Sequence, residues 1–308
     1  MPDRPPRSKV VVFGSLNMDL VARVPRMPEA GETLAGHSFI TNPGGKGANQ
    51  AVACARQGAR VDMAGRVGND AFGAELRAAL QADGIDIQGV IATATSTGVA
   101  MIMVDDAAQN CIAIVPGANA SVSVEDAEAL RGKLADARVL VLQFEVPMEP
   151  LVRAAAISRE LGCTVMLNPA PAKELPDALW PLVDILVLNE IEARLLSELP
   201  SVNAENATDA AALLLKRGPK HVIVTLGSQG VVWATAGAAR HFEAVKVTAV
   251  DTTAAGDTFI GALSAMLVEG ATMEAALRHA IKAAAICVTR AGAQASIPSR
   301  AEVEGVAT

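Results

Sequence analysis

Short apolar runs alternate with longer alanine-rich segments along most of the chain. Continuous apolar runs are typical of strands buried on both faces, whereas apolar residues spaced three and four apart indicate helices. This alternation predicts an α/β fold with a mostly parallel sheet and helices on both faces. The runs predict strands at 10–14, 61–67, 139–144, 164–167, 185–188 and 222–225, and helices at 47–56, 71–82, 149–161, 256–269 and 273–289.

Two segments interrupt the alternation and predict a second, smaller sheet. One spans 31–41, and the other, 98–116, has two apolar halves around the turn-like 105–110, as in a β-hairpin with a longer loop. Neither has a helix to cover it. We therefore expect a small sheet, from about 17–41 and 98–116, against the substrate-binding mouth or another subunit. No long linker divides the chain, so we expect a single domain over 1–308.

Composition and charge narrow the class of protein. Apolar residues make up 51% of the chain, aromatic residues 3%, and tyrosine is absent, so Val, Ile, Leu, Ala and Met must fill the core. A formal charge of −7 argues against nucleic acid or an anionic membrane surface as the main partner. The amino terminus is polar and proline-rich, with no run long enough for a signal peptide or a membrane span, so we expect a cytoplasmic protein.

Cysteine and histidine spacing gives no sign of disulfides or zinc. The four cysteines, Cys54, Cys111, Cys163 and Cys287, lie in apolar surroundings without CxxC spacing, which predicts reduced core thiols. The histidines lack HxxxH or HExxH spacing. The histidines therefore give no sign of a zinc site, and the absence of GxSxG removes the commonest serine-hydrolase signature in an α/β chain.

The segment 251–261 carries the clearest chemical signal. Small residues up to Gly256 leave the backbone open in front of a predicted helix, whose amino terminus favours phosphate. Asp257 follows directly, where a substrate hydroxyl can approach the same phosphate. A base beside an anion site suggests phosphoryl transfer. The alternative is that Asp257 is an ordinary helix N-cap.

Polar side chains also follow other predicted strands, at the sheet edge where open α/β folds bind ligands. Asn17 and Asp19 can point the same way in an extended chain and offer an amide and a carboxylate to vicinal hydroxyls, although a polar turn is the alternative. Glu145 follows the strand 139–144 and is either a ligand or an acid at a helix start. Asn189 and Glu192 are placed to order Mg²⁺ near phosphates, or form a capping box.

Two glycine-containing segments complete the candidate set. Segment 42–51 opens a helix with Lys46 and Asn49, but it lacks the GxxxxGK[ST] order of a P-loop, and no segment gives GxGxxG after a strand. We interpret it as a clamp for substrate hydroxyls, with a flexible turn and a solvated lysine as the alternative. Segment 225–230 has small residues that would admit nucleotide phosphate or ribose, but as a lone turn it is a weak signal.

Taken in order from about 9 to 298, these motifs resemble the ribokinase family of carbohydrate kinases. Further similar stretches are 96–100, 117–120, 167–172 and 288–294. The resemblance implies a ribokinase-like three-layer α/β/α fold with a small β-sheet lid. It also implies transfer of the ATP γ-phosphoryl group to the O5 hydroxyl of D-ribose, with Mg²⁺, activation by potassium, and a homodimer formed through the lid sheet.

The resemblance also implies a role for individual residues. Asp257 would be the catalytic base. The sugar would be held by Asn17, Asp19, Gly45, Lys46, Asn49, Glu145 and Asp257, and ATP by Asn189, Thr225, Gly227, Ser228, Gly230, Ala255 and Gly256. The potassium loop would comprise Asp251, Thr253, Cys287, Arg290, Gly292 and Ser296, mostly through main-chain carbonyls, with Glu192 in the Mg²⁺ environment.

Three positions depart from the family pattern, and two rival functions stay open. Pro43, Ile260 and Ile281 replace residue types that are common in the family, which affects nucleotide contacts and the shape of the mouth more than the reaction. One rival is a kinase of the same fold for a nucleoside, fructose or a deoxy sugar, although few aromatic residues are available to stack a base. The other is a non-catalytic nucleotide or sugar sensor, against which Lys46 and Asp257 argue.

Overall fold

The computed structural model describes residues 9–107 and 109–305. The proline-rich segment 1–8 and the last three residues of the domain expected over 1–308 lie outside these ranges. The strands are β1 Lys9–Phe13, β2 Asn17–Arg23, β3 Ser38–Gly44, β4 Arg60–Gly68, β5 Asp86–Thr93, β6 Gly98–Val104, β7 Asn110–Val115, β8 Ala137–Gln143, β9 Thr164–Asn168, β10 Ile185–Asn189, β11 His221–Thr225, β12 Val231–Thr235 and β13 Ala238–Phe242. The α-helices are α1 Lys46–Arg56, α2 Ala71–Ala82, α3 Val124–Ala129, α4 Arg131–Ala135, α5 Met148–Leu161, α6 Glu190–Ser197, α7 Ala207–Leu215, α8 Ala255–Val268, α9 Met273–Cys287 and α10 Arg300–Glu304.

Nine strands form the large sheet, in the order β13-β12-β11-β10-β9-β8-β1-β4-β5. All neighbours from β11 to β5 pair in parallel, and β12 and β13 add an antiparallel edge. The chain goes from β1 to β4 and β5 on one side, then returns to β8 on the other side of β1. The order therefore reverses between β1 and β8, and such a switch point opens a crevice at the carboxyl ends of the strands.

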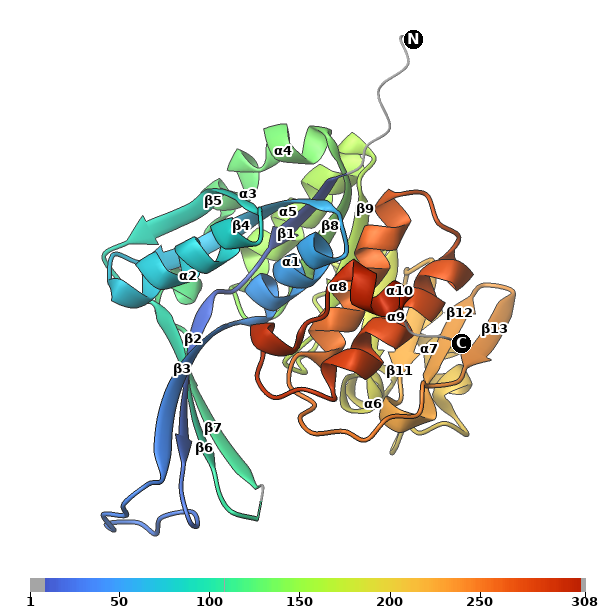
Figure 1. Ribbon diagram of the computed structural model, residues 1–308. Helices are drawn as coiled ribbons and strands as arrows, with labels where there is room; N and C mark the ends of the chain where they lie inside the picture. The colour runs from blue at the N-terminus through green and yellow to red at the C-terminus, as the bar shows by residue number, and fades with distance from the viewer. Residues whose placement is uncertain (1–8, 108, 306–308) are drawn as a thin grey trace.

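Successive residues of each central strand enter two different apolar cores. In β1, Val10 and Val12 belong to one buried cluster, and Val11 and Phe13 belong to the other. Burial on both faces explains the continuous apolar runs in the sequence. Helices α1, α2, α8 and α9 contribute to the first core, and α3 to α7 contribute to the second, which gives the three-layer architecture in Figure 1.

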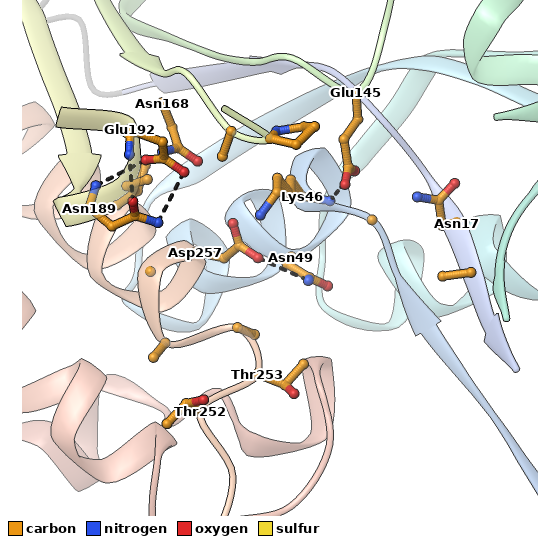
Figure 2. Close-up of a pocket in the computed structure, with 18 of the residues that line it drawn as sticks. Asn17, Lys46, Asn49, Glu145, Asn168, Asn189, Glu192, Thr252, Thr253 and Asp257 are labelled. Atoms are coloured by element: carbon orange, nitrogen blue, oxygen red, sulfur yellow. Dashed lines mark hydrogen bonds between the residues drawn. The ribbon is translucent and has the colours of Figure 1, made fainter. Parts of the chain in front are cut away.

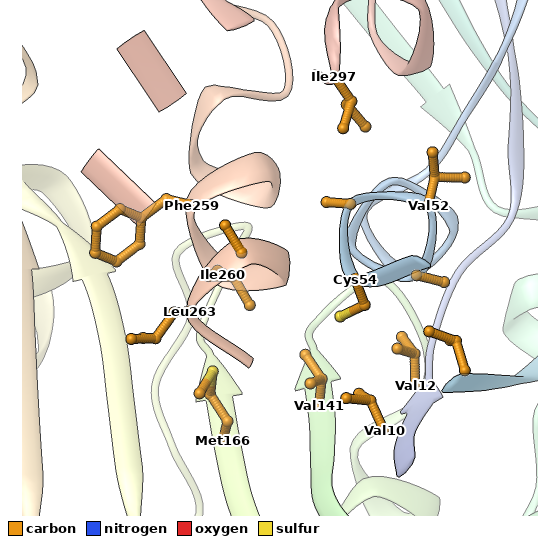
Figure 3. Close-up of a cluster of buried hydrophobic side chains, with 14 of the residues drawn as sticks. Val10, Val12, Val52, Cys54, Val141, Met166, Phe259, Ile260, Leu263 and Ile297 are labelled. Carbon is orange, nitrogen blue, oxygen red and sulfur yellow. The ribbon is translucent and has the colours of Figure 1, made fainter. Parts of the chain in front are cut away.

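Helices α1 and α8 pack closely in the first core, side by side above the sheet (Figure 3). Gly261 makes this approach possible, because a Cβ atom there would lie 2.2 Å from the Cβ of Ala53 and 2.7 Å from the backbone nitrogen of Cys54. The contact brings the first turn of α8 against α1. The polar residues at the amino-terminal ends of both helices therefore lie next to each other.

The small sheet has four strands in the order β3-β2-β6-β7 and projects away from the body of the molecule (Figure 1). Strands β6 and β7 form the predicted antiparallel hairpin. Strand β3 starts later than the predicted segment 31–41 and extends to Gly44, because Asn42–Gly44 continues the pairing with β2 as far as Asn17. The sheet is therefore built from the two regions that the sequence indicated.

Several elements were not predicted from the sequence: β5, β12, β13, α3, α4, α6, α7 and α10. Strand β13 is exposed along most of its length, so it lacks an apolar run. The expectation of four core thiols is wrong for Cys111, which is exposed on the outer strand β7, whereas Cys54, Cys163 and Cys287 are buried and free. Among the described residues, no helix has the length and apolar character that a membrane span requires.

Candidate active site

A cleft of about 430 Å³ opens where the carboxyl ends of the large sheet face the small sheet. Figure 2 shows that polar side chains from both parts of the molecule point into it. The large sheet contributes residues that follow β8, β9 and β10 and the end of β11, at the edge expected for a ligand site. The small sheet contributes Asn17, Asp19, Ala100, Ile102, Ile112 and Ile114.

Asp257 lies at the floor of this cleft, in the first turn of α8. The N-cap is Ala254, which has a left-handed φ of 60° and makes no side-chain cap hydrogen bond, so the interpretation of Asp257 as an N-cap is wrong. Ala255 and Gly256 also line the cleft, and the first N–H groups of a helix have no intrahelical partner. The N–H of Ala255 donates to Thr252 O at 3.3 Å. The positive end of α8 therefore faces the cleft next to the carboxylate.

Two side-chain amides of α1 hold the Asp257 carboxylate. Asn49 Nδ2 donates to Oδ2 at 3.1 Å, and Gln50 Nε2 donates to Oδ1 at 2.8 Å. Asp257 is 6% exposed, so these bonds form away from bulk water. Within the described residues, the buried Oδ1 atom of Asn49 has no hydrogen-bond partner.

Lys46 begins α1 and points toward Asp257 in Figure 2. Burial lowers the pKa of its ammonium group, but the carboxylates of Asp257, Glu145 and Glu192 more than offset this, so the pKa is raised. Lys46 thus stays charged within the cleft. The alternative of a solvated lysine on a flexible turn does not hold, because Lys46 belongs to the helix and is partly buried.

Glu145 connects the loop after β8 to the start of α1. Its Oε2 atom accepts a hydrogen bond from Ser15 Oγ at 2.6 Å and one from the backbone N–H of Lys46 at 3.0 Å. Ser15 Oγ in turn accepts from the N–H of Gly47. Glu145 therefore fixes the glycine-rich segment while lining the cleft. Ser15 was not singled out in the sequence, because its contact with Glu145 spans 130 positions.

Asn17 and Asp19 lie on β2 and line the cleft from the same face of the strand, as predicted for an extended chain. Asn119 donates from Nδ2 to Asn17 Oδ1 at 2.8 Å, and it also bonds both backbone groups of Leu16. Asn17 is therefore left with its Nδ2 donor for a ligand. No role of its own was predicted for Asn119 from the sequence.

Asp19 is an acid without a partner. Its carboxylate makes no hydrogen bond to any residue in the described ranges, and its pKa is raised to about 7 by burial and by the nearby Glu145 and Asp257. In its ionised form this carboxylate can only accept hydrogen bonds, and ligand hydroxyl groups are suitable donors for it.

Asn189 and Glu192 form the capping box that was the alternative interpretation, and they also line the cleft. Asn189 Oδ1 accepts from Glu192 N at 2.9 Å, and Glu192 Oε2 accepts from Asn189 N at 3.0 Å. Glu192 is buried, and its pKa is raised mainly by that burial. A structural role at the start of α6 and a role toward a bound cation are therefore compatible. The latter stays a prediction.

The predicted nucleotide turn only partly reaches this cleft. Thr225 lines it, whereas Gly227 and Ser228 are exposed on the following turn and are not among its lining residues. Gly230 has a packing role, because a Cβ atom there would lie 2.0 Å from Phe242 O. The roles of these three residues toward ATP stay predictions.

The predicted cation loop is assembled from two segments. Asp251 Oδ1 accepts from the N–H of Thr253 and Oδ2 from the N–H of Gly292, both at 2.9 Å. Cys287 Sγ lies 3.6 Å from Thr253 O and 3.1 Å from Ser296 Oγ. The side chain of Arg290 forms an ion pair with Glu302, which leaves its main chain for any role in the loop.

The three unusual positions differ in their placement. Pro43 lies in β3 opposite Met18, and Ile260 lines the cleft from α8. Ile281 is 8% exposed in the apolar core of α9 and is not among the lining residues. Of the three, only Ile260 contributes directly to the wall of the cleft.

Comparisons with known proteins agree with this architecture. The model of the pfkB family of carbohydrate kinases matches residues 7–300. A ribokinase of Schizosaccharomyces pombe is 43% identical over 96% of both chains, and a deoxyribokinase of Salmonella typhi is 38% identical over 94% of this chain and 95% of its own. The structure of an Arabidopsis thaliana ribokinase complexed with ribose and ATP superposes with a TM-score of 0.89, 34% identity, and coverage of 96% of this chain and 97% of that chain.

The chain therefore belongs to the pfkB family, and the protein is a carbohydrate kinase with the ribokinase-like fold. The family match covers both sheets and all the cleft residues described above. The sensor hypothesis, which keeps the fold but removes the chemistry, has no support from these relatives.

Proposed function

We propose that the protein transfers the γ-phosphoryl group of ATP to the O5 hydroxyl of D-ribose, with Asp257 as the base. The observation that carries this proposal is the position of Asp257, buried in the first turn of α8 and open to a cleft that the polar residues of β2 close from the other side. The named relatives support ribose and ATP as the substrates. A cytoplasmic location, where ATP is available, is proposed with it.

Each group has a distinct role in this reaction. Asp257 accepts the proton of the hydroxyl, and the N–H groups at the start of α8 stabilise charge on the transferred group. Asn17, Asp19, Asn49 and Glu145 orient the sugar, and Lys46 adds positive charge between sugar and phosphate. Little covalent chemistry is required, because alignment and electrostatic stabilisation dominate phosphoryl transfer.

The charges in the cleft support a need for cations. The described residues that line it include four acids, Asp19, Glu145, Glu192 and Asp257, but only one lysine. No group of three or more His, Cys, Asp or Glu side chains in the described ranges could hold a metal by itself. This fits Mg²⁺, which commonly binds through one or two carboxylates, water and substrate phosphates. When bound, Mg²⁺ would neutralise phosphate charge, with Glu192 and Asn189 as the nearby protein groups.

We propose potassium as the activating cation at the loop formed by Asp251, Thr253, Cys287, Arg290, Gly292 and Ser296. Asp251 ties the two segments of this loop together through backbone N–H groups, and the loop leads directly into α8. Oxygen ligands of main-chain carbonyls suit a hard cation. A cation here would add positive charge near the start of α8 and order its first turn.

We further propose that residues 1–308 act as one domain whose small sheet is both a lid and a homodimer interface. Ile40, Ile102 and Ile112 lie on the cleft-facing side of this sheet, and Ile40 and Ile112 are each 52% exposed. Exposed apolar side chains in one patch favour association. Ile112→Glu should therefore shift the protein from dimer to monomer in sedimentation velocity, and an unchanged dimer would place the interface elsewhere.

The similarity to a deoxyribokinase makes 2-deoxyribose a second candidate acceptor. Asp19 has no hydrogen-bond partner among the described residues and thus favours an acceptor with one more hydroxyl group, because a half-buried carboxylate in the occupied cleft would otherwise lose a donor. ADP release should be measured with ATP and D-ribose, 2-deoxyribose, fructose and adenosine, each with and without potassium. The highest kcat/KM for D-ribose is expected, and a higher value for any other acceptor would replace the proposed substrate.

A further inference from the structure

Gln50 contacts the proposed base but does not reach the cleft. Its side chain is completely buried on α1 and is not among the lining residues. Nε2 donates to Asp257 Oδ1 at 2.8 Å and lies 3.3 Å from Asn168 Oδ1, and Oε1 accepts from Gln143 Nε2 at 2.7 Å. Because Gln50 does not line the cleft, any effect of this residue on turnover must act through the residues that it contacts, of which Asp257 and Asn168 line the cleft.

A backbone carbonyl determines the direction of these hydrogen bonds. Asn168 Nδ2 donates to Val187 O at 3.1 Å, and a carbonyl oxygen can only accept. Asn168 must therefore turn its own Oδ1 atom toward Gln50. Gln50 in turn must present Nε2 to Asn168 and Asp257, which leaves Oε1 for Gln143.

The rest of the network prevents Gln50 from rotating. A rotated amide would place oxygen against Asn168 Oδ1 and Asp257 Oδ1, and nitrogen against the Gln143 donor. All of these side chains except Asp257 and Asn168 are wholly buried, so each lost bond would leave a polar group without water. Strands β8, β9 and β10 thereby fix a donor on one oxygen of the carboxylate.

We propose that Gln50 is the positioning residue for Asp257, acting with Gln143 and Asn168. This inference rests on the proposed role of Asp257 as base. With Gln50 on Oδ1 and Asn49 on Oδ2, the carboxylate cannot turn about its own axis, and both donors complement its ionised, acceptor-only form. Asp257 thus meets the acceptor hydroxyl in one orientation, which is the condition for efficient proton transfer.

Three substitutions test this inference. Gln50→Leu should lower kcat by about 10- to 100-fold with little change in the KM for sugar or ATP, because only the alignment of the base is lost. The acid limb of its kcat profile should move to higher pH, since an ionised carboxylate loses a donor. Gln143→Leu removes one of the contacts that orient Gln50 and leaves those to Asn168 and Asp257, so it should show the same changes to a smaller degree.

Gln50→Glu tests the positioning role through the pH dependence of activity, which a purely structural role of Gln50 would not change. The protonated Glu side chain can still donate to Asp257, whereas the ionised one cannot and adds a like charge beside it. The activity of Gln50→Glu relative to Gln50→Leu should therefore be highest at low pH and fall as pH rises.

Gln57 offers a matched control at the other end of α1. It is also completely buried, its Nε2 donates to Pro298 O at 2.8 Å, and its Oε1 lies 2.8 Å from His279 Nε2. Gln57→Leu should cost comparable stability in thermal unfolding while kcat and its pH profile stay unchanged in potassium-containing buffer.

The outcomes separate this inference from the function on which it rests. In an Asp257→Asn background, Gln50→Leu should cause no further loss of kcat, because both changes remove the same step.

If Asp257→Asn abolishes turnover but Gln50→Leu and Gln143→Leu match Gln57→Leu, the positioning role is wrong and the base stands. If Asp257→Asn retains turnover, the proposed base is wrong. If Gln50→Leu does not fold, Gln143→Leu alone decides, and an unchanged kcat and pH profile overturn the inference.

Discussion

Two carboxylates in one cleft have opposite environments. Asp257 lies on the rigid contact between α1 and α8 and has an amide donor on each oxygen, whereas Asp19 lies on the small sheet and has none among the described residues. The first is organised before any ligand arrives. The second has no donor among the described residues, so a ligand or water in the cleft must supply its hydrogen bonds. Under the proposed function, the large-sheet body holds the base ready for proton transfer, and Asp19 of the small sheet helps to recognise the acceptor.

The largest effect should come from the organised carboxylate. Asp257→Asn keeps the size of the side chain but removes its ability to take a proton, so kcat should fall by about 10³-fold or more while sugar affinity changes little. Steady-state kinetics and calorimetric titration with D-ribose would measure the two quantities. Turnover close to that of the unmodified protein would mean that another group accepts the proton.

The unpartnered carboxylate should show the reverse pattern. Asp19→Ala removes a charged acceptor for sugar hydroxyls, which is expected to raise the KM for D-ribose by about 10- to 100-fold. The KM for ATP should change much less. Steady-state kinetics with a panel of sugar acceptors at saturating ATP would measure the change in the KM for D-ribose. A fall in kcat as large as that of Asp257→Asn would contradict the division of roles between the two acids.

A smaller effect should appear in the pH dependence of sugar binding. The pKa of Asp19 is raised to about 7, so this group is protonated in much of the ligand-free protein below neutral pH. Hydroxyl donors bind the ionised form better, so affinity for D-ribose should rise with pH through about 7 and level off above it. Titrations across this range would follow the change. Asp19→Asn should remove the slope, and a variant with the unmodified slope would assign it to another group.

The smallest effect concerns stability. Because the folded state raises the Asp19 pKa from 3.8 to about 7, ionisation of this group costs folding free energy above the lower value, and the full cost applies above the higher one. Asp19→Asn should therefore unfold at a higher temperature than the unmodified protein at pH 8, with no difference near pH 4. Calorimetry at both pH values tests this, and equal transitions at pH 8 would show that burial of Asp19 has no net cost.

The sequence predicted the central strands and the small sheet, because these depend on local patterns. Each central strand is an apolar run that fills two cores, and the hairpin of β6 and β7 has its own turn. Strand β13 escaped prediction since it lies at an exposed edge and carries polar residues such as Arg240 and His241. Antiparallel backbone pairing with β12, rather than an apolar run, holds β13 in the sheet.

Functional residues could be predicted from the sequence only where they lie close to the end of a strand or the start of a helix. Asp257, Lys46 and Asn17 stand next to strand or helix starts that the sequence marks. Gln50 is different, because its contact with Asp257 joins positions 207 residues apart and depends on the packing of α1 against α8. From the sequence alone, Gln50 cannot be distinguished from any other polar residue on a predicted helix. Gly261, which permits that packing, carries no chemical signal of its own.

A structure of the protein with D-ribose and a non-hydrolysable ATP analogue would test the central claim most directly. The account predicts the O5 oxygen of the sugar within about 3.2 Å of an Asp257 oxygen, at the start of α8, with other sugar hydroxyls donating to Asp19. An O5 atom beside Asp19, or one too far from Asp257 for a direct or single-water hydrogen bond, would contradict it.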